Sequence, residues 1–147
     1  MRFLLDENTL PRLVETLDTV YLPTPHEFHH VTTLGWSGEL DEPLFERAVA
    51  GGFDALITGD RRHLVDHLPA LQASGLHWVG YRRRANLGGL ALLGYETSLL
   101  VGAMDHVIGE LEQAPEQRLL ALKGAGRERH QQLEVLTGHR ILAFGRK

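Results

Sequence analysis

Short apolar runs alternate with amphipathic segments along the first half of the chain. Three runs have the length of strands, and they occupy residues 2–5, 28–32 and 53–58. The last run is almost continuously apolar, which is typical of a parallel strand covered on both faces. Between the runs, apolar residues recur at three- and four-residue spacing. This spacing predicts one helix over residues 9–18 and another that begins at Leu40 or Asp41 and ends at Gly51.

The second half of the chain continues the alternation and then changes character. We expect a third helix over about residues 61–73, a strand at residues 77–80 and a longer helix over residues 89–111. The tail from Gln131 to Phe144 is predicted to form two strands around a Thr137-Gly138 turn, giving an edge hairpin. Residues 114–130 give little signal.

This order of elements predicts an α/β fold with a short parallel sheet, helices on both faces and a C-terminal edge hairpin. Ligands of such sheets bind beyond the carboxyl ends of the strands. We expect a single domain over residues 1–147, with a core at residues 1–112 and a C-terminal extension at residues 113–147.

Composition narrows the class of protein. The 147 residues are 43% hydrophobic, enough for one buried core, and the absence of cysteine excludes disulfides and thiolate zinc sites. The first seven residues include acids, unlike a signal peptide. Glu96 and Asp105 interrupt the long apolar helix, so its uncharged stretches are too short to span a bilayer. We expect a cytoplasmic protein without a membrane segment.

Charge is distributed unevenly within the net value of −4. Residues 1–60 contain eleven acids and three bases, whereas residues 61–147 contain eight acids and twelve bases. This asymmetry suits a metal site beside a phosphate-binding surface. Two ordinary solvated surfaces would give the same counts.

Three aspartates carry the candidate chemistry. Asp6 follows the first strand, Asp60 follows the third, and Asp41 opens the helix after the second, so the topology brings them to one edge. Crowded carboxylates repel one another unless a cation or hydrogen bonds compensate. Carboxylate oxygens suit Mg²⁺ or Mn²⁺, which also accept phosphate oxygens and activate water. Metal-assisted phosphodiester hydrolysis is therefore the leading hypothesis.

Three segments also carry a family resemblance: FLLDEN at residues 3–8, LDE at residues 40–42 and LITGD at residues 56–60. In order and spacing, over about residues 1–80, they resemble the motifs of the PIN-like nucleases, and most of all a compact bacterial branch. The resemblance implies a three-layer PIN-like fold and Mg²⁺- or Mn²⁺-dependent endoribonuclease activity on RNA. Many relatives are toxins, which implies an antitoxin protein as a further partner.

The resemblance also implies roles for individual residues. The positions that match the catalytic, metal-binding acids are Asp6, Asp41 and Asp60. Asn8 and Thr58 would support them. Glu42 is an alternative to its neighbour Asp41, because the sequence leaves the phase of the helix open.

One position departs from the pattern. Relatives often have an aspartate two residues after the third-strand acid, and this chain has Arg62 there. The departure makes an inactive RNA- or protein-binding module the alternative function. A receiver-like signalling domain is a weaker alternative, because Gly80 stands where it would need a hydroxyl and no lysine precedes Lys123.

Basic residues near the same edge are candidates for binding RNA phosphates, with an ordinary solvated loop as the other interpretation. They are Arg61, Arg62, Arg82, Arg83 and Arg84. The small residues Gly94, Ser98 and Gly102 form a stripe along the long helix. We expect this stripe to pack against the sheet, with a homodimer seam as the alternative.

Overall fold

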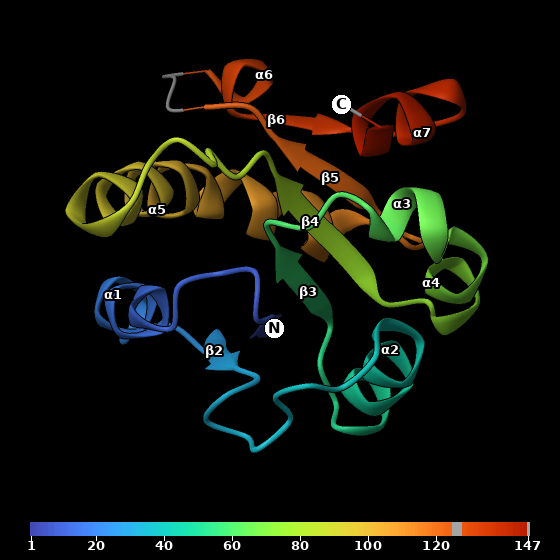
Figure 1. Ribbon diagram of the computed structural model, residues 1–147, viewed down its shortest axis with the longest axis horizontal. Helices are drawn as coiled ribbons and strands as arrows, with labels where there is room; N and C mark the ends of the chain where they lie inside the picture. The colour runs from blue at the N-terminus through green and yellow to red at the C-terminus, as the bar shows by residue number, and fades with distance from the viewer. Residues whose placement is uncertain (125–127, 147) are drawn as a thin grey trace.

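The computed structural model, which describes residues 1–124 and 128–146, is built on one six-stranded sheet (Figure 1). Its strands are β1 (Arg2–Leu5), β2 (Glu27–His30), β3 (Ala55–Thr58), β4 (His77–Tyr81), β5 (Leu119–Leu122) and β6 (Leu133–Val135). They lie in the order β2-β1-β3-β4-β5-β6, and only the β5–β6 pair is antiparallel. The predicted α/β fold with a mainly parallel sheet is confirmed.

Helices cover both faces of this sheet (Figure 1). They are α1 (Arg12–Tyr21), α2 (Asp41–Ala50), α3 (His63–Asp66), α4 (Leu68–Ser74), α5 (Gly89–Gln113), α6 (Arg129–Gln132) and α7 (His139–Arg146). One hydrophobic core lies between the sheet and α1 and α5, and the other lies under α2, α3, α4 and α7. The three layers follow from these two cores.

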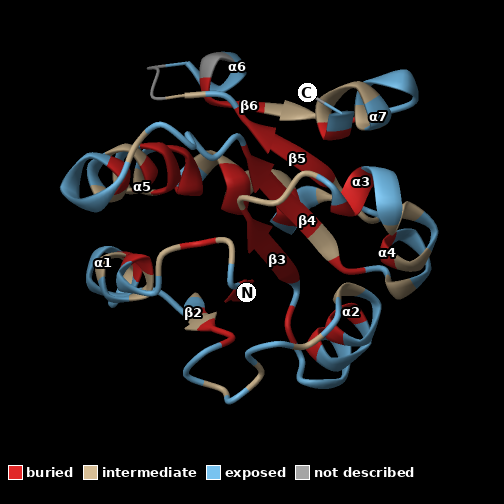
Figure 2. Cartoon of the chain, in the orientation of Figure 1, coloured by how far each residue is buried: buried red, intermediate tan, exposed pale blue. Residues whose placement is uncertain are grey.

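The central strands are mostly apolar, as expected of strands whose two faces are both buried (Figure 2). In β1, Phe3 and Leu5 point to the α5 side, whereas Leu4 points to the α2 side. In register, Leu5 of β1 is paired with Ile57 of β3, and the Asp6 amide continues the ladder by donating to the Ile57 carbonyl at 3.2 Å. The carboxyl ends of β1 and β3 therefore lie level with each other.

The single helix predicted over residues 61–73 is two helices, α3 and α4, which meet at His67. Pro69 lies in the first turn of α4. Proline has no amide hydrogen, and its ring clashes with the carbonyl four residues earlier, so one continuous helix through this position would be strained. The break leaves α3 as a single turn directly after the Asp60 loop.

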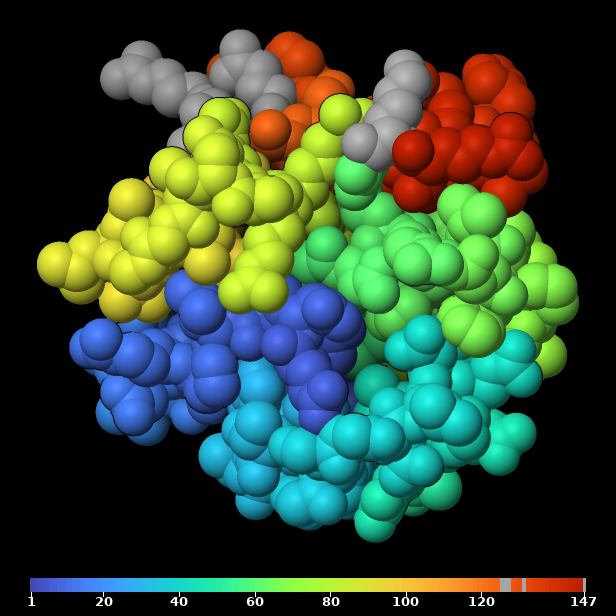
Figure 3. All heavy atoms as spheres, in the orientation of Figure 1, coloured from blue at the N-terminus to red at the C-terminus, as the bar shows by residue number. Residues whose placement is uncertain are grey.

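The predicted hairpin over residues 131–144 is wrong in its second strand, because residues 139–146 form α7. An antiparallel edge pair does exist, but β6 pairs with β5, from the segment that gave little signal. Ile141 and Phe144 pack toward the core while Arg140 is exposed, a helical spacing. The resulting helix lies against α3, as the red and green surfaces in Figure 3 show.

The small-residue stripe of α5 lies on its outer face. Gly94, Ser98 and Gly102 are exposed, and a β-carbon added at either glycine would meet nothing within 4 Å. The prediction that this stripe packs against the sheet is therefore wrong, since the sheet contacts the opposite, leucine-rich side. A homodimer seam stays a prediction. In the part of the chain that is described, no helix is long and apolar enough to cross a membrane.

Candidate active site

Asp6 stands at the carboxyl end of β1 and is almost fully buried, with 3% of its surface exposed. The Thr58 hydroxyl donates to Asp6 Oδ2 at 2.5 Å, and the backbone N–H of Asn8 donates to Asp6 Oδ1 at 3.0 Å. Burial raises the pKa of Asp6 to about 6, although these hydrogen bonds and the charge of His63 act in the opposite direction. The carboxylate is thus oriented from two sides in a setting that disfavours its charge.

Thr58, fully buried at the end of β3, ties Asp6 to Asp60. Its hydroxyl donates to Asp6 and accepts from the Asp60 amide at 2.8 Å. The Asp60 carboxylate in turn accepts from the Arg62 amide at 2.8 Å, which closes the turn that leads into α3. Thr58 therefore joins the side chain of Asp6 to the backbone of Asp60.

Asp41 and Glu42, at the start of α2, face two histidines. His63 Nε2–H donates to Asp41 Oδ1 at 3.1 Å, and His67 Nε2 lies 3.2 Å from Asp41 Oδ2. The other nitrogen of His67 lies 3.1 Å from Glu42 Oε1. The hydrogen bond from His63 holds the pKa of Asp41 below its usual range. Both candidates for the second acid therefore contact the same histidine.

His63, on α3, is buried among the three acids. Burial lowers its pKa, but the hydrogen bond to Asp41 and the charges of Asp6, Asp41 and Asp60 raise it overall. Trp78 Nε1–H points at His63 Nδ1 at 3.4 Å, and the imidazole packs edge-on against Phe45. The ring therefore lies close to Asp6, Asp41 and Asp60, which together form the acidic edge.

Sequence reasoning missed both histidines. Their four-residue spacing, directly after Asp60, was the only available signal, and it would put both side chains on one face of a continuous helix. Instead, the break at His67 separates them, and each reaches Asp41 from a different short helix or its end. Only the tertiary fold reveals that they bind the second acid.

Within residues 1–124 and 128–146, no three histidine or acidic side chains are arranged to hold a metal ion. Asp6 and Asp60 share Thr58, whereas Asp41 and Glu42 contact histidines. Mg²⁺ is commonly held by one or two carboxylates together with waters and substrate phosphates. Asp6 and Asp60 have the chemistry of that reduced donor set, and among the described residues the three acids do not form a metal-binding group.

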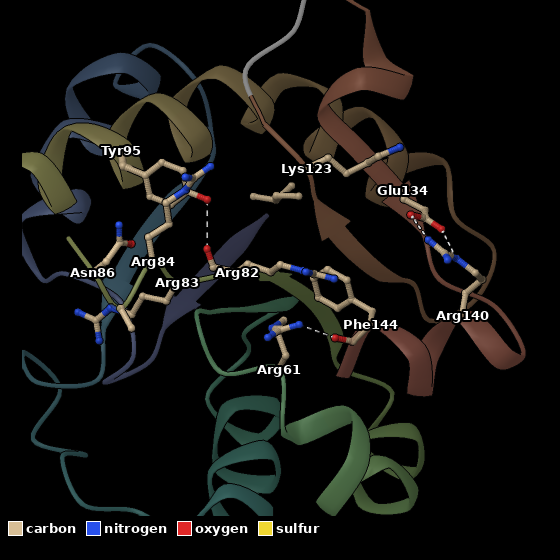
Figure 4. Close-up of a pocket in the computed structure, with 12 residues that line it drawn as sticks. Arg61, Arg82, Arg83, Arg84, Asn86, Tyr95, Lys123, Glu134, Arg140 and Phe144 are labelled. Carbon is tan, nitrogen blue, oxygen red and sulfur yellow. Dashed lines mark hydrogen bonds and ion pairs between the residues drawn. The ribbon is translucent and has the colours of Figure 1, made fainter. Parts of the chain in front are cut away.

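A basic cavity of about 580 Å³ lies at the same end of the sheet (Figure 4). Its basic lining residues are Arg61, Arg82, Arg83, Arg84, Lys123 and Arg140. Four of the five arginines predicted to bind RNA are among them. The fifth, Arg62, does not line the cavity, because its side chain pairs with Asp66 one helical turn away at 2.9 Å.

The arginines of the basic cavity have different partners. Arg61 donates to the Phe144 carbonyl of α7 at 2.8 Å, and Arg83 lies 3.3 Å from Glu96. The guanidinium groups of Arg82 and Arg84 lie over aromatic rings, 5.8 Å from the centre of Phe144 and 5.0 Å from that of Tyr95. Arg61 and Arg83 therefore have structural contacts, and Arg82 and Arg84 keep their charge available.

Glu96 is a second feature that sequence reasoning missed. It is fully buried on α5, and burial raises its pKa while the charge of Arg83 opposes the shift. The Tyr81 hydroxyl is buried near the same carboxylate. An acid inside an otherwise apolar helix was the available signal, and the structure explains it as the counterion that holds Arg83 beside Gly59.

Comparison with known families agrees with this geometry. A family model described as a PIN like domain matches residues 1–81, more than half of the chain. The chain belongs to the PIN-like domain family. No curated protein and no solved structure gives a significant match. The resemblance seen in the sequence is confirmed at the level of this family.

The PIN-like match ends at the last residue of β4. It contains the acidic edge, Thr58 and both histidines that contact Asp41. The long helix α5 and the C-terminal elements, including Lys123 and Phe144 of the basic cavity, lie beyond it. PIN-like domains are often nucleases, so the matched part of the chain is the part that suggests nuclease chemistry.

Proposed function

We propose that this chain is an endoribonuclease that hydrolyses RNA phosphodiester bonds with Mg²⁺ or Mn²⁺ at Asp6 and Asp60. The observation that carries the proposal is the Thr58 hydroxyl, which bonds to the Asp6 carboxylate and to the Asp60 amide at one sheet edge. The basic cavity at the same end of the molecule supports it, because RNA is a polyanion.

Asp6 and Asp60 would hold the ion. When bound, such an ion stabilises negative charge on phosphate oxygens and lowers the pKa of a bound water. The chain's own contribution is orientation: Thr58 and Asn8 donate to Asp6 and fix its carboxylate. Burial around Asp6 also excludes water, which strengthens the attraction of this carboxylate for a cation.

Asp41 acts in this proposal through His63. Its carboxylate accepts the Nε2–H of the imidazole, and the Trp78 N–H faces the other nitrogen, so the ring is held from both ends. A ring held in this way is a positioning residue rather than a base for the substrate. When the ring is protonated, Nδ1 carries a proton and no longer accepts from Trp78, while the bond to Asp41 remains and the positive charge offsets part of the repulsion within the acidic edge.

A binding-only PIN-like module is the second candidate. It is favoured by the contacts of Asp41 and Glu42 with histidines and by Arg62 at a position where an acid was expected. A toxin role and an antitoxin partner rest on the family resemblance alone.

Cleavage of single-stranded RNA by the purified protein tests the proposal. Cleavage should require Mn²⁺ or Mg²⁺, and Asp60→Asn should reduce its rate on the order of 100-fold or more. Asp105→Asn, on the exposed face of α5, is the matched control and should cleave like the wild type. RNA binding without cleavage at any metal concentration would favour the binding-only module.

A thermal shift gives a readout that does not depend on activity. An ion held only by the folded protein stabilises it by about 1.4 kcal/mol at ten times its dissociation constant. Mn²⁺ should therefore raise the melting temperature of the wild type and of Asp105→Asn, and Asp60→Asn should remove most of the shift. An equal shift in all three proteins would place the ion elsewhere.

A further inference from the structure

The C-terminal segment supplies one whole side of the basic cavity. Figure 4 shows Tyr95 and Arg84 on one side and Phe144 and Lys123 on the other. The first side comes from the loop after β4 and from α5, and the second comes from the end of β5 and from α7. Both sides lie beyond residues 1–81, the region that matches the PIN-like family, and of the lining residues Arg61 lies within that region. The cavity is therefore built mainly by the part of the chain that follows the family match.

The lining of the cavity is strongly positive. Six basic side chains face it and one acid, Glu134, does so. Glu134 makes a two-pronged ion pair with Arg140, at 2.8 Å and 3.0 Å, and Glu96 pairs with Arg83. Of the four other cations of the lining, Arg61 and Lys123 donate to the carbonyls of Phe144 and His130, and Arg82 and Arg84 lie over aromatic rings. None of these contacts neutralises the positive charge. An unbalanced positive charge in a concave site attracts anions.

Two of these cations are held in place before any ligand arrives. Arg84 lies over the Tyr95 ring and Arg82 over the Phe144 ring, and the Tyr95 hydroxyl donates to the Arg82 carbonyl at 3.1 Å. A guanidinium group stacked on a ring keeps its N–H donors free for the oxygens of a phosphate. Such ordering reduces the entropy lost on binding.

The cavity is also connected to the acidic edge. Arg61, next to Asp60, donates to the Phe144 carbonyl. A β-carbon at Gly145 would lie 2.8 Å from Val65 Cγ2 and 3.2 Å from the Arg61 carbonyl, so α7 fits closely on the residues that follow Asp60. The position of Phe144 is thus set by the loop that carries a proposed catalytic acid.

We propose that the basic cavity binds a phosphodiester of the RNA strand adjacent to the bond cleaved at the acidic edge. Arg82, Arg84 and Lys123 contact the phosphate, and Tyr95 and Phe144 are positioning residues. The identification of the strand as RNA rests on the proposed function, because phosphate chemistry alone is shared with free phosphate. The volume of about 580 Å³ is in the range of ligand-binding pockets.

Fluorescence anisotropy with a labelled single-stranded RNA, measured over a series of salt concentrations, tests this site. The full-length Asp60→Asn protein serves as the background, so that the probe is not cut. Adding Arg84→Ala or Lys123→Ala should weaken binding and reduce the slope of log affinity against log salt by about 0.7 for each lost phosphate contact. Arg146→Ala is the matched control, since Arg146 is exposed on α7 outside the cavity.

The aromatic residues are tested separately. Phe144→Leu removes the ring on which the Arg82 guanidinium rests but removes no charge. This variant should therefore weaken RNA binding at every salt concentration without changing the salt slope. Phe144→Tyr keeps the ring and should restore the affinity. A loss of affinity common to both variants would contradict a positioning role for the ring.

The outcomes separate this inference from the proposed function. If the wild type cuts RNA but the cavity variants bind it like Arg146→Ala, the phosphate site is wrong and the nuclease proposal stands. If the wild type neither binds nor cuts RNA, both fail. Inorganic phosphate is the second probe: competition at a concentration matching that of the RNA phosphates would assign the cavity to a free anion and overturn the RNA assignment.

Discussion

The acidic edge and the basic cavity lie at the same end of the sheet, yet they are built in opposite ways. Asp6 is buried and receives hydrogen bonds from Thr58 and Asn8, and burial still raises its pKa to about 6. Arg82 and Arg84 are exposed and rest on aromatic rings. The carboxylate is therefore held at a cost in folding free energy, whereas the cations keep their charge in water. Substitutions in the two regions should have opposite effects on stability.

The largest effect should come from Asp6→Asn. The folded-state pKa of about 6 exceeds the ordinary value of 3.8, so the folded protein binds the proton more tightly and loses stability as pH rises through this interval. A shift of this size corresponds to about 3 kcal/mol at neutral pH. Removing the charge should raise the free energy of unfolding at pH 7 by up to about 3 kcal/mol, reduced by weaker hydrogen bonds.

Urea unfolding at several pH values checks this expectation. Below the unfolded-state pKa, Asp6 is protonated in both states, so Asp6→Asn and wild type should have similar stability there. Asp105→Asn should follow the wild type at every pH. A loss of stability at pH 7 in Asp6→Asn would mean that the hydrogen bonds outweigh the cost of burying the charge, and the contrast between the two regions would disappear.

A smaller effect is expected from a matched pair of glycine substitutions. Gly145→Ala puts a β-carbon 2.8 Å from Val65 Cγ2, and overpacking of this kind costs about 1 kcal/mol or more. Gly94→Ala places the same group in open space on α5 and should raise the free energy of unfolding by up to about 1 kcal/mol. Chemical denaturation should show a lower free energy of unfolding for Gly145→Ala and a higher one for Gly94→Ala than for the wild type.

Gly145→Ala should also weaken RNA binding, because it moves one side of the basic cavity without changing any charge. Gly94→Ala should leave binding unchanged. Equal RNA affinity in both variants would show that the cavity does not depend on how α7 is seated.

The smallest change in stability should come from Arg84→Ala. Its side chain is exposed, and a cation–π contact at an exposed site contributes about 0.5–1 kcal/mol. Differential scanning fluorimetry should show a melting temperature close to that of the wild type, although RNA binding falls. A large loss of stability would mean that Arg84 is a structural residue. In that case only a reduced salt slope, and not the loss of RNA affinity alone, would indicate a lost phosphate contact.

The sequence was a good guide where the pattern is local. β1 was predicted with its observed bounds, and the acids at the ends of β1 and β3 lie where the topology placed them. The secondary structure of the C-terminal tail could not be predicted from its own pattern, because a short segment such as Ile141–Phe144 fits a strand or a helix equally well. Its packing against α3 decides between the two. The contacts of Asp41 with His63 and His67 depend on the break before Pro69, and the closure of the basic cavity by Phe144 depends on how α7 is seated.

Gly59 has a consequence for anyone who redesigns or diversifies this chain. A β-carbon at this position would lie 2.6 Å from the Asn8 carbonyl oxygen, a backbone atom that no side-chain rotation can move aside. The backbones of the turns that follow β1 and β3 are therefore in direct contact, and neither turn can be exchanged, lengthened or randomised independently of the other. In a saturation library at position 59, selection for a folded acidic edge should return glycine alone, and grafting a new loop at residues 7–10 should succeed only when the path of the Asn8 carbonyl is copied with it.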